Sequence, residues 1–192
     1  MVTRCRWAEN DELMRRYHDQ EWGTPLHDDR LLFEFLILEG NQAGLSWNTI
    51  LQKRENYRLA FDNFDYNKIA KYAEQNIDEL MNNKGIIRNT LKIKSVITNA
   101  KVFLKVQKEF GSFNKYIWKF VNYKTINNKF KDLSELPSKT EQSEQMSKDL
   151  KKRGFKFVGP TICYAFMQAV GMVNDHIIVC FRYNEINEGL YK

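Results

Sequence analysis

Four residues that could bind one metal ion stand at opposite ends of the 192-residue chain. Cys5 and His18 lie near its start, and His176 and Cys180 lie near its end. His176 and Cys180 are four residues apart, so on a helix they would share one face. Two thiolates and two imidazoles complete a tetrahedron without an open position, which is typical of a structural zinc site. Such an ion would tie the two terminal segments together.

The same four residues also have a plainer interpretation. Cysteine often behaves as a small buried apolar residue, and the histidines could be ordinary core or surface groups. The spacing also departs from the close C-x-x-C pairs of zinc ribbons and fingers. Spacing alone therefore leaves both a zinc site and a metal-free core open.

Glu39 is the acidic residue whose position most needs an explanation. It is expected to end a buried apolar helix, next to Gly40, where the helix dipole disfavours a carboxylate. Catalysis or ligand binding would justify this position, and a solvated helix end is the alternative. Four large aromatic residues nearby in the sequence could line a pocket for a flat ring, with core packing as the alternative for each: Trp7, Tyr17, Trp22 and Trp47.

A glycine-containing segment, 154–159, is expected to form a hairpin turn between two helices. Gly154 and Gly159 permit positive φ and a close approach of the backbone to a partner. Pro160 would start the second helix, whose free amides could bind a phosphate. Basic residues crowd the same stretch and favour nucleic acid over a plain helical turn with solvated cations: Lys148, Lys151, Lys152, Arg153 and Lys156.

Hydrophobic periodicity predicts an all-α protein, since no window shows the sustained alternation of a half-buried strand. The chain is expected to form a single domain over 1–192, with two helical lobes and a polar surface loop at 122–140. The first expected helix runs from Asp28–Asp29 to Glu39–Gly40, and the second begins at Trp47 after a Ser46 cap. Further helices are expected after an Asp65 cap, over 77–81, from Leu91 to Gly111 and over 113–121. The last two contain Met146 and Leu150, and begin at Pro160, respectively.

Composition narrows the protein class further. Lys and Arg number 30 against 24 Asp and Glu, a net charge of +6 that is compatible with nucleic acid. No run of about 18 apolar residues occurs, and the first residues lack the apolar stretch of a signal peptide, so no membrane association is expected. Three widely separated cysteines favour a reducing, cytoplasmic compartment. A monomer is expected, because no long amphipathic surface remains after the core is filled.

Three long segments resemble the bacterial 3-methyladenine DNA glycosylase I family. They are YHDQEWG at 17–23, LEGNQAGLSW at 38–47 and KKRGFKFVG at 151–159. VNDH at 173–176 and Cys180 match as well, so the resemblance runs from about Arg4 to Cys180. It implies an all-α, zinc-containing branch of the helix-hairpin-helix glycosylases. That family excises 3-methyladenine from alkylated double-stranded DNA in base excision repair.

The resemblance also implies roles for individual residues. Glu39 would be the catalytic residue, reading the polar edge of the flipped base and stabilising its positive charge. The implied zinc ligands are Cys5, His18, His176 and Cys180. The implied base pocket holds Tyr17, Trp22, Glu39 and Trp47. The implied DNA contacts are Lys151, Lys152, Gly154, Lys156, Gly159 and Leu45, the last of which would enter the duplex.

Several alternatives stay open within this interpretation. Asn41 stands where a glutamine is expected and Met14 where an aromatic residue is expected, which keeps a shifted lesion range open. Asp175 is a rival catalytic acid. Thr161 occupies the place of the Schiff-base lysine of bifunctional relatives, which predicts a monofunctional enzyme. A zinc-stapled DNA-binding module without catalysis is the alternative of a different class, and it has no need of Glu39 among aromatic residues.

Overall fold

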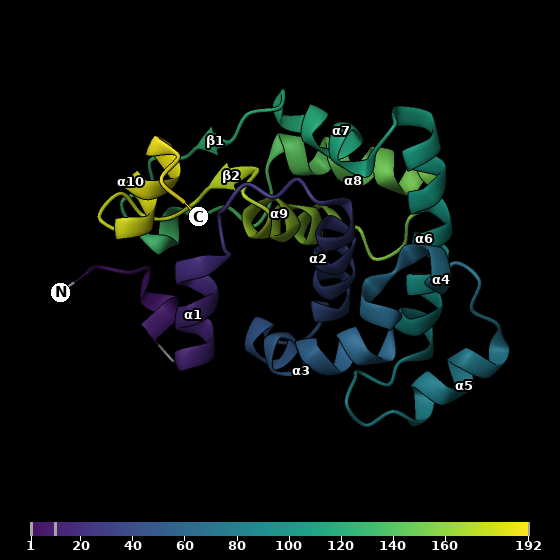
Figure 1. The fold of residues 1–192 in the computed structure, drawn as a ribbon. Coiled ribbons are helices and arrows are strands. Elements are labelled where there is room, and N and C mark those ends of the chain that lie inside the picture. Colours follow the sequence, from purple (N-terminus) through teal and green to yellow (C-terminus); the bar gives the residue numbers. More distant parts are fainter. Residues whose placement is uncertain (1, 10, 192) are drawn as a thin grey trace.

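The computed structural model describes residues 2–9 and 11–191, and helices make up most of this part of the chain. In Figure 1, α1 (Glu12–Gln20) and α10 (Phe181–Glu188) lie on one side and α6 (Thr90–Phe110) on the other, with α2 (Asp29–Gln42) and α9 (Pro160–Ala169) between them. The remaining helices are α3 (Trp47–Ala60), α4 (Tyr66–Ile69), α5 (Glu74–Asn82), α7 (Phe113–Trp118) and α8 (Glu141–Arg153), with short 3-10 helices at Arg6–Glu9, Asp62–Phe64, Lys119–Val121 and Leu133–Glu135.

Side-chain caps start the helices where the sequence predicted them. The Asp28 carboxylate accepts from the Leu31 amide at the start of α2, and the Ser46 hydroxyl accepts from the Thr49 amide at the start of α3. Asp65 caps α4 in the same way, although α4 is only four residues long. These caps fix the direction in which α2 and α3 leave the intervening loop.

The predicted end of α2 at Glu39–Gly40 is wrong, because the helix continues to Gln42. Gly40 does not stop the helix. A Cβ atom there would lie 3.2 Å from the Cβ of Phe157, so glycine lets the 154–159 turn pack against α2. The last carbonyl oxygens of the helix are hydrogen-bonded by Lys92 of α6, since its Nζ donates to those of Asn41 and Ala43. Glu39 consequently lies inside the last turn of α2.

The predicted pair of helices around the 154–159 turn is present as α8 and α9. Gly154 ends α8 with φ +104°, a left-handed conformation that favours glycine, and Pro160 occupies the first turn of α9. Asn99 of α6 holds the turn from the side: its Oδ1 accepts from the Lys156 amide at 2.8 Å and its Nδ2 donates to the Lys156 carbonyl at 3.0 Å.

Two departures from a purely helical chain appear. β1 (Ile126–Asn127) and β2 (Val173–Asn174) form a parallel pair, which joins the polar 122–140 segment to the end of the chain. Two-residue strands are too short to leave an alternating pattern in the sequence. His176 and Cys180 also do not share a helix face, because they lie in the turn that precedes α10.

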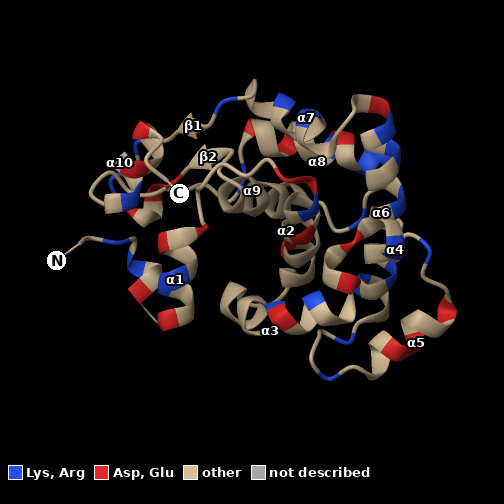
Figure 2. Ribbon diagram, in the orientation of Figure 1, with Lys and Arg blue, Asp and Glu red and all other residues tan. Residues whose placement is uncertain are grey.

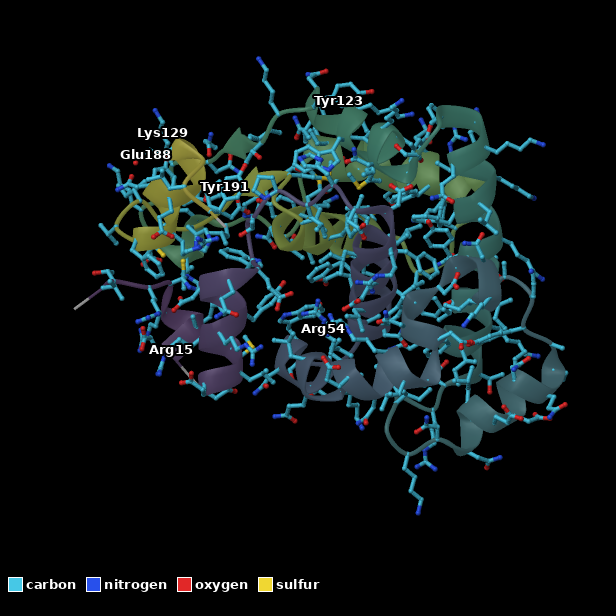
Figure 3. The ribbon with its side chains drawn as sticks, viewed as in Figure 1. Arg15, Arg54, Tyr123, Lys129, Glu188 and Tyr191 are labelled. Carbon is cyan, nitrogen blue, oxygen red and sulfur yellow. The ribbon has the colours of Figure 1, made fainter. Side chains whose placement is uncertain are left out.

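Buried apolar side chains from helices along the whole chain pack into one hydrophobic cluster, which includes both Cys5 and Cys180. A buried ion network sits against this cluster. Arg54, labelled in Figure 3, donates to the Glu34 carboxylate at 2.6 Å and to the Glu21 carboxylate at 2.7 Å. The arginine thereby holds the chain that leaves α1 against α2 and α3. Within the described residues, no helix is both long and apolar enough to cross a membrane.

Candidate active site and metal centre

The structure brings the four predicted metal ligands together into one buried cluster. The ligand atoms of Cys5, His18, His176 and Cys180 all lie within 4.8 Å of one another. The Cys180 sulfur lies 3.4 Å from His18 Nε2 and 3.6 Å from His176 Nδ1, and the Cys5 sulfur lies 3.7 Å from His176 Nδ1. The Cys5 thiol and both imidazoles hydrogen-bond to the Cys180 sulfur and hold the pKa of the Cys180 thiol well below its ordinary value.

The outer nitrogen of each imidazole is already engaged, which determines the nitrogen that faces the cluster. His18 Nδ1 lies 2.8 Å from Asp19 Oδ1, and Arg4 holds the same carboxylate. His176 Nε2 lies 3.0 Å from the backbone carbonyl oxygen of Trp22. Protein metal sites orient their histidine ligands in this way. The donor set fits a closed, four-coordinate metal ion.

A cavity of about 290 Å³ opens between α1, α2, α3 and α9. This is the lower end of the size range of small-molecule pockets. Its lining residues include all four residues of the implied base pocket and also Trp7 and Met14, which the sequence had already drawn attention to. The others, such as Gln168, were not singled out from the sequence. The lining residues are Trp7, Met14, Tyr17, Trp22, Glu39, Gln42, Trp47, Leu136, Ala165 and Gln168. We call this space the aromatic cavity.

Aromatic rings form much of its wall. The rings of Tyr17 and Trp47 are 5.4 Å apart between centroids and tilted by 49°. Trp7 and Trp22 meet edge to face at 5.1 Å. The Trp47 indole nitrogen is buried without a hydrogen-bond partner in the protein. A planar ligand with a polar edge would suit these walls.

Glu39 is the acidic residue of the cavity, and it is only 3% exposed. Its Oε2 atom is buried without a hydrogen-bond partner. Burial raises the pKa of Glu39 to about 8, so its carboxyl group is mostly protonated at neutral pH. Burial also raises the pKa of Tyr17 well above its ordinary value, with the Glu39 charge as the next cause. A buried carboxyl with an unused polar atom is a feature of sites that bind ligand.

The cluster of Cys5, His18, His176 and Cys180, called the ligand cluster because these residues could bind a metal ion, lies directly behind the wall of the aromatic cavity. The rings of Trp22 and His176 are 4.6 Å apart between centroids, and those of Trp7 and His18 are 5.2 Å apart. Both tryptophans line the cavity. A metal ion in the cluster would therefore fix the positions of Trp7 and Trp22 without contacting a molecule bound in the cavity.

Three of the predicted DNA-contacting lysines are exposed: Lys151 and Lys152 in the last turn of α8, and Lys156 in the 154–159 turn. Arg153 behaves differently from its neighbours, since it pairs with Glu109 at 2.7 Å and with Asp149 at 2.8 Å. Figure 2 shows more basic residues along the neighbouring α6.

Two further predicted DNA contacts are open to a partner. A Cβ on Gly159 would meet nothing within 4 Å, so the space on that side of the residue is open. Leu45 is 39% exposed, in the loop between α2 and α3.

Three further residues considered from the sequence differ in their position relative to the cavity. Asn41 does not line the cavity: it is buried, donates to the Ile37 carbonyl and accepts from the Tyr57 hydroxyl. Met14 does line the cavity. Asp175 is buried outside the cavity lining, and its carboxylate already accepts three hydrogen bonds.

This chain is similar to known proteins over nearly its whole length. The model of the methyladenine glycosylase family matches residues 7–183. The DNA-3-methyladenine glycosylase of Haemophilus influenzae is 51% identical, over 94% of this chain and 97% of its own. DNA-3-methyladenine glycosylase 1 of Escherichia coli is 49% identical, over 95% of this chain and 97% of its own.

The fold of this chain is also similar to solved structures of 3-methyladenine DNA glycosylase I. A crystal structure of 3-methyladenine DNA glycosylase I has a TM-score of 0.91 at 49% identity, covering 93% of this chain and 98% of its own. The Staphylococcus aureus enzyme, solved to explain 3-methyladenine recognition, has a TM-score of 0.91 at 37% identity and covers 94% and 96%. This chain therefore belongs to the methyladenine glycosylase family.

Proposed function

We propose that this protein is a monofunctional DNA glycosylase that excises 3-methyladenine from alkylated double-stranded DNA in base excision repair. The observation that carries the proposal is the buried Glu39 carboxyl, which has an unpartnered oxygen in an aromatic cavity. The names of the relatives support the choice of lesion.

The chemistry follows from the nature of the lesion. A base inside a duplex cannot reach a cavity of this kind, so the nucleotide must flip out of the stack. Methylation at N3 makes the base cationic and hence a good leaving group. The bond between C1′ of deoxyribose and the base nitrogen breaks, and its electron pair stays on the base, which leaves neutral. The oxygen of a water molecule bonds to C1′ and loses a proton, which completes the hydrolysis.

Glu39, Tyr17, Trp22 and Trp47 would select this base. Adenine presents an acceptor, N7, beside a donor, its amino group. A protonated carboxyl offers the matching donor and acceptor, and an ionised one would stabilise the positive charge. Tyr17 and Trp47 would stack on the cationic ring or contact its edge, and Trp22 would complete the cavity wall. Selective binding of the cationic base then contributes most of the rate enhancement.

The α8–turn–α9 unit would act as a helix-hairpin-helix that holds the DNA backbone. Lys151, Lys152 and Lys156 supply attraction to phosphates. The open space at Gly159 and the free amides of the first turn of α9 suit one phosphate group, with Gly154 needed for the turn. Leu45 would enter the gap left by the flipped nucleotide.

Zn²⁺ is the metal that we propose for the cluster of Cys5, His18, His176 and Cys180. The donor set and its burial support a structural ion that joins the two ends of the fold. We further propose that the chain acts as one domain over 1–192, as a cytoplasmic monomer. Its three cysteines form no disulfide, which suits a reducing compartment.

The enzyme is proposed to leave an intact abasic site. Thr161, in the first turn of α9, stands where a bifunctional relative would have its lysine nucleophile. Borohydride treatment of the reaction should therefore trap no covalent protein–DNA adduct. A trapped adduct would show that strand-cleaving chemistry is present.

The alternative is a DNA-binding module without catalysis, and release of the free base separates the two. DNA methylated to contain 3-methyladenine and 7-methylguanine should yield free 3-methyladenine, detected by chromatography. Glu39→Gln should slow this release about 100-fold, because the positive charge of the bound base favours ionisation of the Glu39 carboxyl, and an amide cannot ionise to stabilise that charge. Absence of release from folded, zinc-loaded protein would favour the binding module.

A further inference from the structure

Gln168 is a cavity residue whose side-chain amide is held in one orientation. It lies on α9, and its Nε2 donates to Asp175 Oδ2 at 2.8 Å. Asp175 is 1% exposed and also accepts from the Tyr164 hydroxyl at 2.5 Å and from Asn128 Nδ2 at 2.7 Å. The Asp175 oxygens accept from all three neighbours, so the NH₂ end of Gln168 is the end that faces Asp175.

The orientation of this amide determines what Gln168 presents to a ligand. Its NH₂ group is engaged by Asp175, which leaves the carbonyl oxygen as the unused polar atom of a side chain that lines the cavity. The hydrogen bond to Asp175 prevents the amide from rotating by 180° and presenting a donor. The cavity therefore has a fixed hydrogen-bond acceptor in addition to Glu39.

We propose that Gln168, oriented by Asp175, is a specificity-determining residue that accepts a hydrogen bond from the 6-amino group of the flipped base and rejects a 6-oxo group. The inference rests on the proposed function. The amino group has two N–H bonds, so Glu39 can accept from the one beside N7 and Gln168 from the other. A guanine lesion would place its O6 against the Gln168 oxygen, which leaves both acceptors unpaired.

This assignment gives Asp175 a role different from that of a catalytic acid. The carboxylate does not line the cavity, and it acts through Gln168. Asn128 and Tyr164 hold Asp175 from the 122–140 segment and from α9, respectively. Asp175 is thus a positioning residue for the reading of the base.

The test compares release of 3-methyladenine and 3-methylguanine from the same methylated duplex under single-turnover conditions. Gln168→Met keeps the length of the side chain and removes the acceptor. We expect the ratio of the two release rates to fall about tenfold, the equivalent of one hydrogen bond. Zinc content and thermal midpoint should stay as in the wild-type protein, because Asp175 keeps two donors.

Two more variants examine the positioning role. In Asp175→Asn, the new amide can donate to the Gln168 oxygen, which turns the Gln168 NH₂ group toward the cavity. Release of 3-methylguanine should then rise while that of 3-methyladenine falls. Tyr164→Phe removes a different donor to the same carboxylate oxygen and leaves the Gln168 bond in place, so the rate ratio should be retained.

The outcomes separate the inference from the proposed function. A wild-type protein that releases neither base overturns the proposed function. A wild-type protein that releases 3-methyladenine, with an unchanged ratio in Gln168→Met, overturns only the role of Gln168. An unchanged ratio in a folded, zinc-loaded Asp175→Asn protein overturns the positioning role. If Asp175→Asn does not fold, the release-rate ratio of Tyr164→Phe decides instead. This variant keeps the Gln168–Asp175 hydrogen bond, so a ratio as low as that of Gln168→Met overturns the positioning role.

Discussion

The Nε2 atom of His176 lies 3.0 Å from the backbone carbonyl oxygen of Trp22, so one hydrogen bond joins the ligand cluster to the cavity wall. The next residue makes this approach possible. A Cβ on Gly23 would lie 3.0 Å from the same His176 nitrogen, and Gly23 has φ +79°. The position of Trp22 in the cavity thus depends on how firmly His176 is held.

Loss of the proposed metal should consequently damage the cavity as well as the fold. We expect Cys180→Ser to lack the single zinc ion proposed for the wild-type protein, measured by atomic absorption, and to have a free energy of unfolding lower by about 3 kcal/mol or more. Binding of free 3-methyladenine, followed by tryptophan fluorescence, should weaken in parallel. Cys163→Ser is the matched control, because Cys163 is buried but lies outside the cluster. Stoichiometric zinc in Cys180→Ser would contradict the ligand assignment.

The raised pKa of Glu39 predicts a pH-dependent stability. The folded-state pKa is about 8 against an ordinary value of 4.5, so the folded protein holds a proton that the unfolded chain releases between these values. Stability from this group is therefore complete below about pH 4.5 and is lost as the pH rises toward 8. At about 1.4 kcal/mol per pH unit, the upper bound of this loss is about 5 kcal/mol.

Glu39→Gln should accordingly be more stable than the wild-type protein at pH 8, and the difference should shrink toward pH 5. Thermal midpoints across this range measure the effect. Glu188→Gln is the control, since Glu188, labelled in Figure 3, is an exposed residue of α10. A pH-independent difference between Glu39→Gln and the wild-type protein would contradict the buried, protonated carboxyl.

The exposed lysines at the end of α8 and the paired Arg153 beside them should affect DNA binding differently. The double change Lys151→Ala and Lys152→Ala should reduce the slope of log affinity against log salt by about 2, because each phosphate contact contributes about 0.9. Arg153→Ala should leave the slope unchanged, since Arg153 pairs with acidic residues of the protein. Its thermal midpoint should fall instead. Fluorescence anisotropy with duplex DNA measures both slopes, and an equal loss in both variants would contradict this division.

Asn41 should influence stability and leave the lesion range unchanged. Its amide joins the Ile37 carbonyl to the Tyr57 hydroxyl, which in turn accepts from the Ile87 amide. Asn41→Ala removes both of the Asn41 bonds and should cost about 1–3 kcal/mol of unfolding free energy. The ratio of released 3-methyladenine to 3-methylguanine should match the wild-type ratio. An altered ratio at unchanged stability would restore a role for Asn41 at the pocket.

Local chemistry explains which parts of the fold could be predicted from the sequence. Asp28 and Ser46 cap the helices that they were expected to cap, because capping depends on a few adjacent residues. The end of α2 was mispredicted, since Gly40 has the local appearance of a terminator. Only its distant contact with Phe157 and the reach of Lys92 from α6 reveal that the helix continues.

The candidate site shows the same limit. The sequence grouped Tyr17, Glu39 and Trp47, and the cavity contains all three. Gln168 gave no signal, because a glutamine on a helix has no special spacing. Its meaning depends on Asp175, which approaches from the turn after β2 only once the chain has folded.

Contacts between the first and last segments also determine when this protein can become active during its synthesis. The Phe181 amide donates to the Thr3 carbonyl at 3.0 Å, and Cys180 lies in the same cluster as Cys5. A nascent chain that still lacks residues 176–181 on the ribosome has neither these contacts nor half of the cluster. The wall that carries Trp7 and Trp22 can therefore be fixed only late in translation, so we expect a truncated product to lack a complete aromatic cavity.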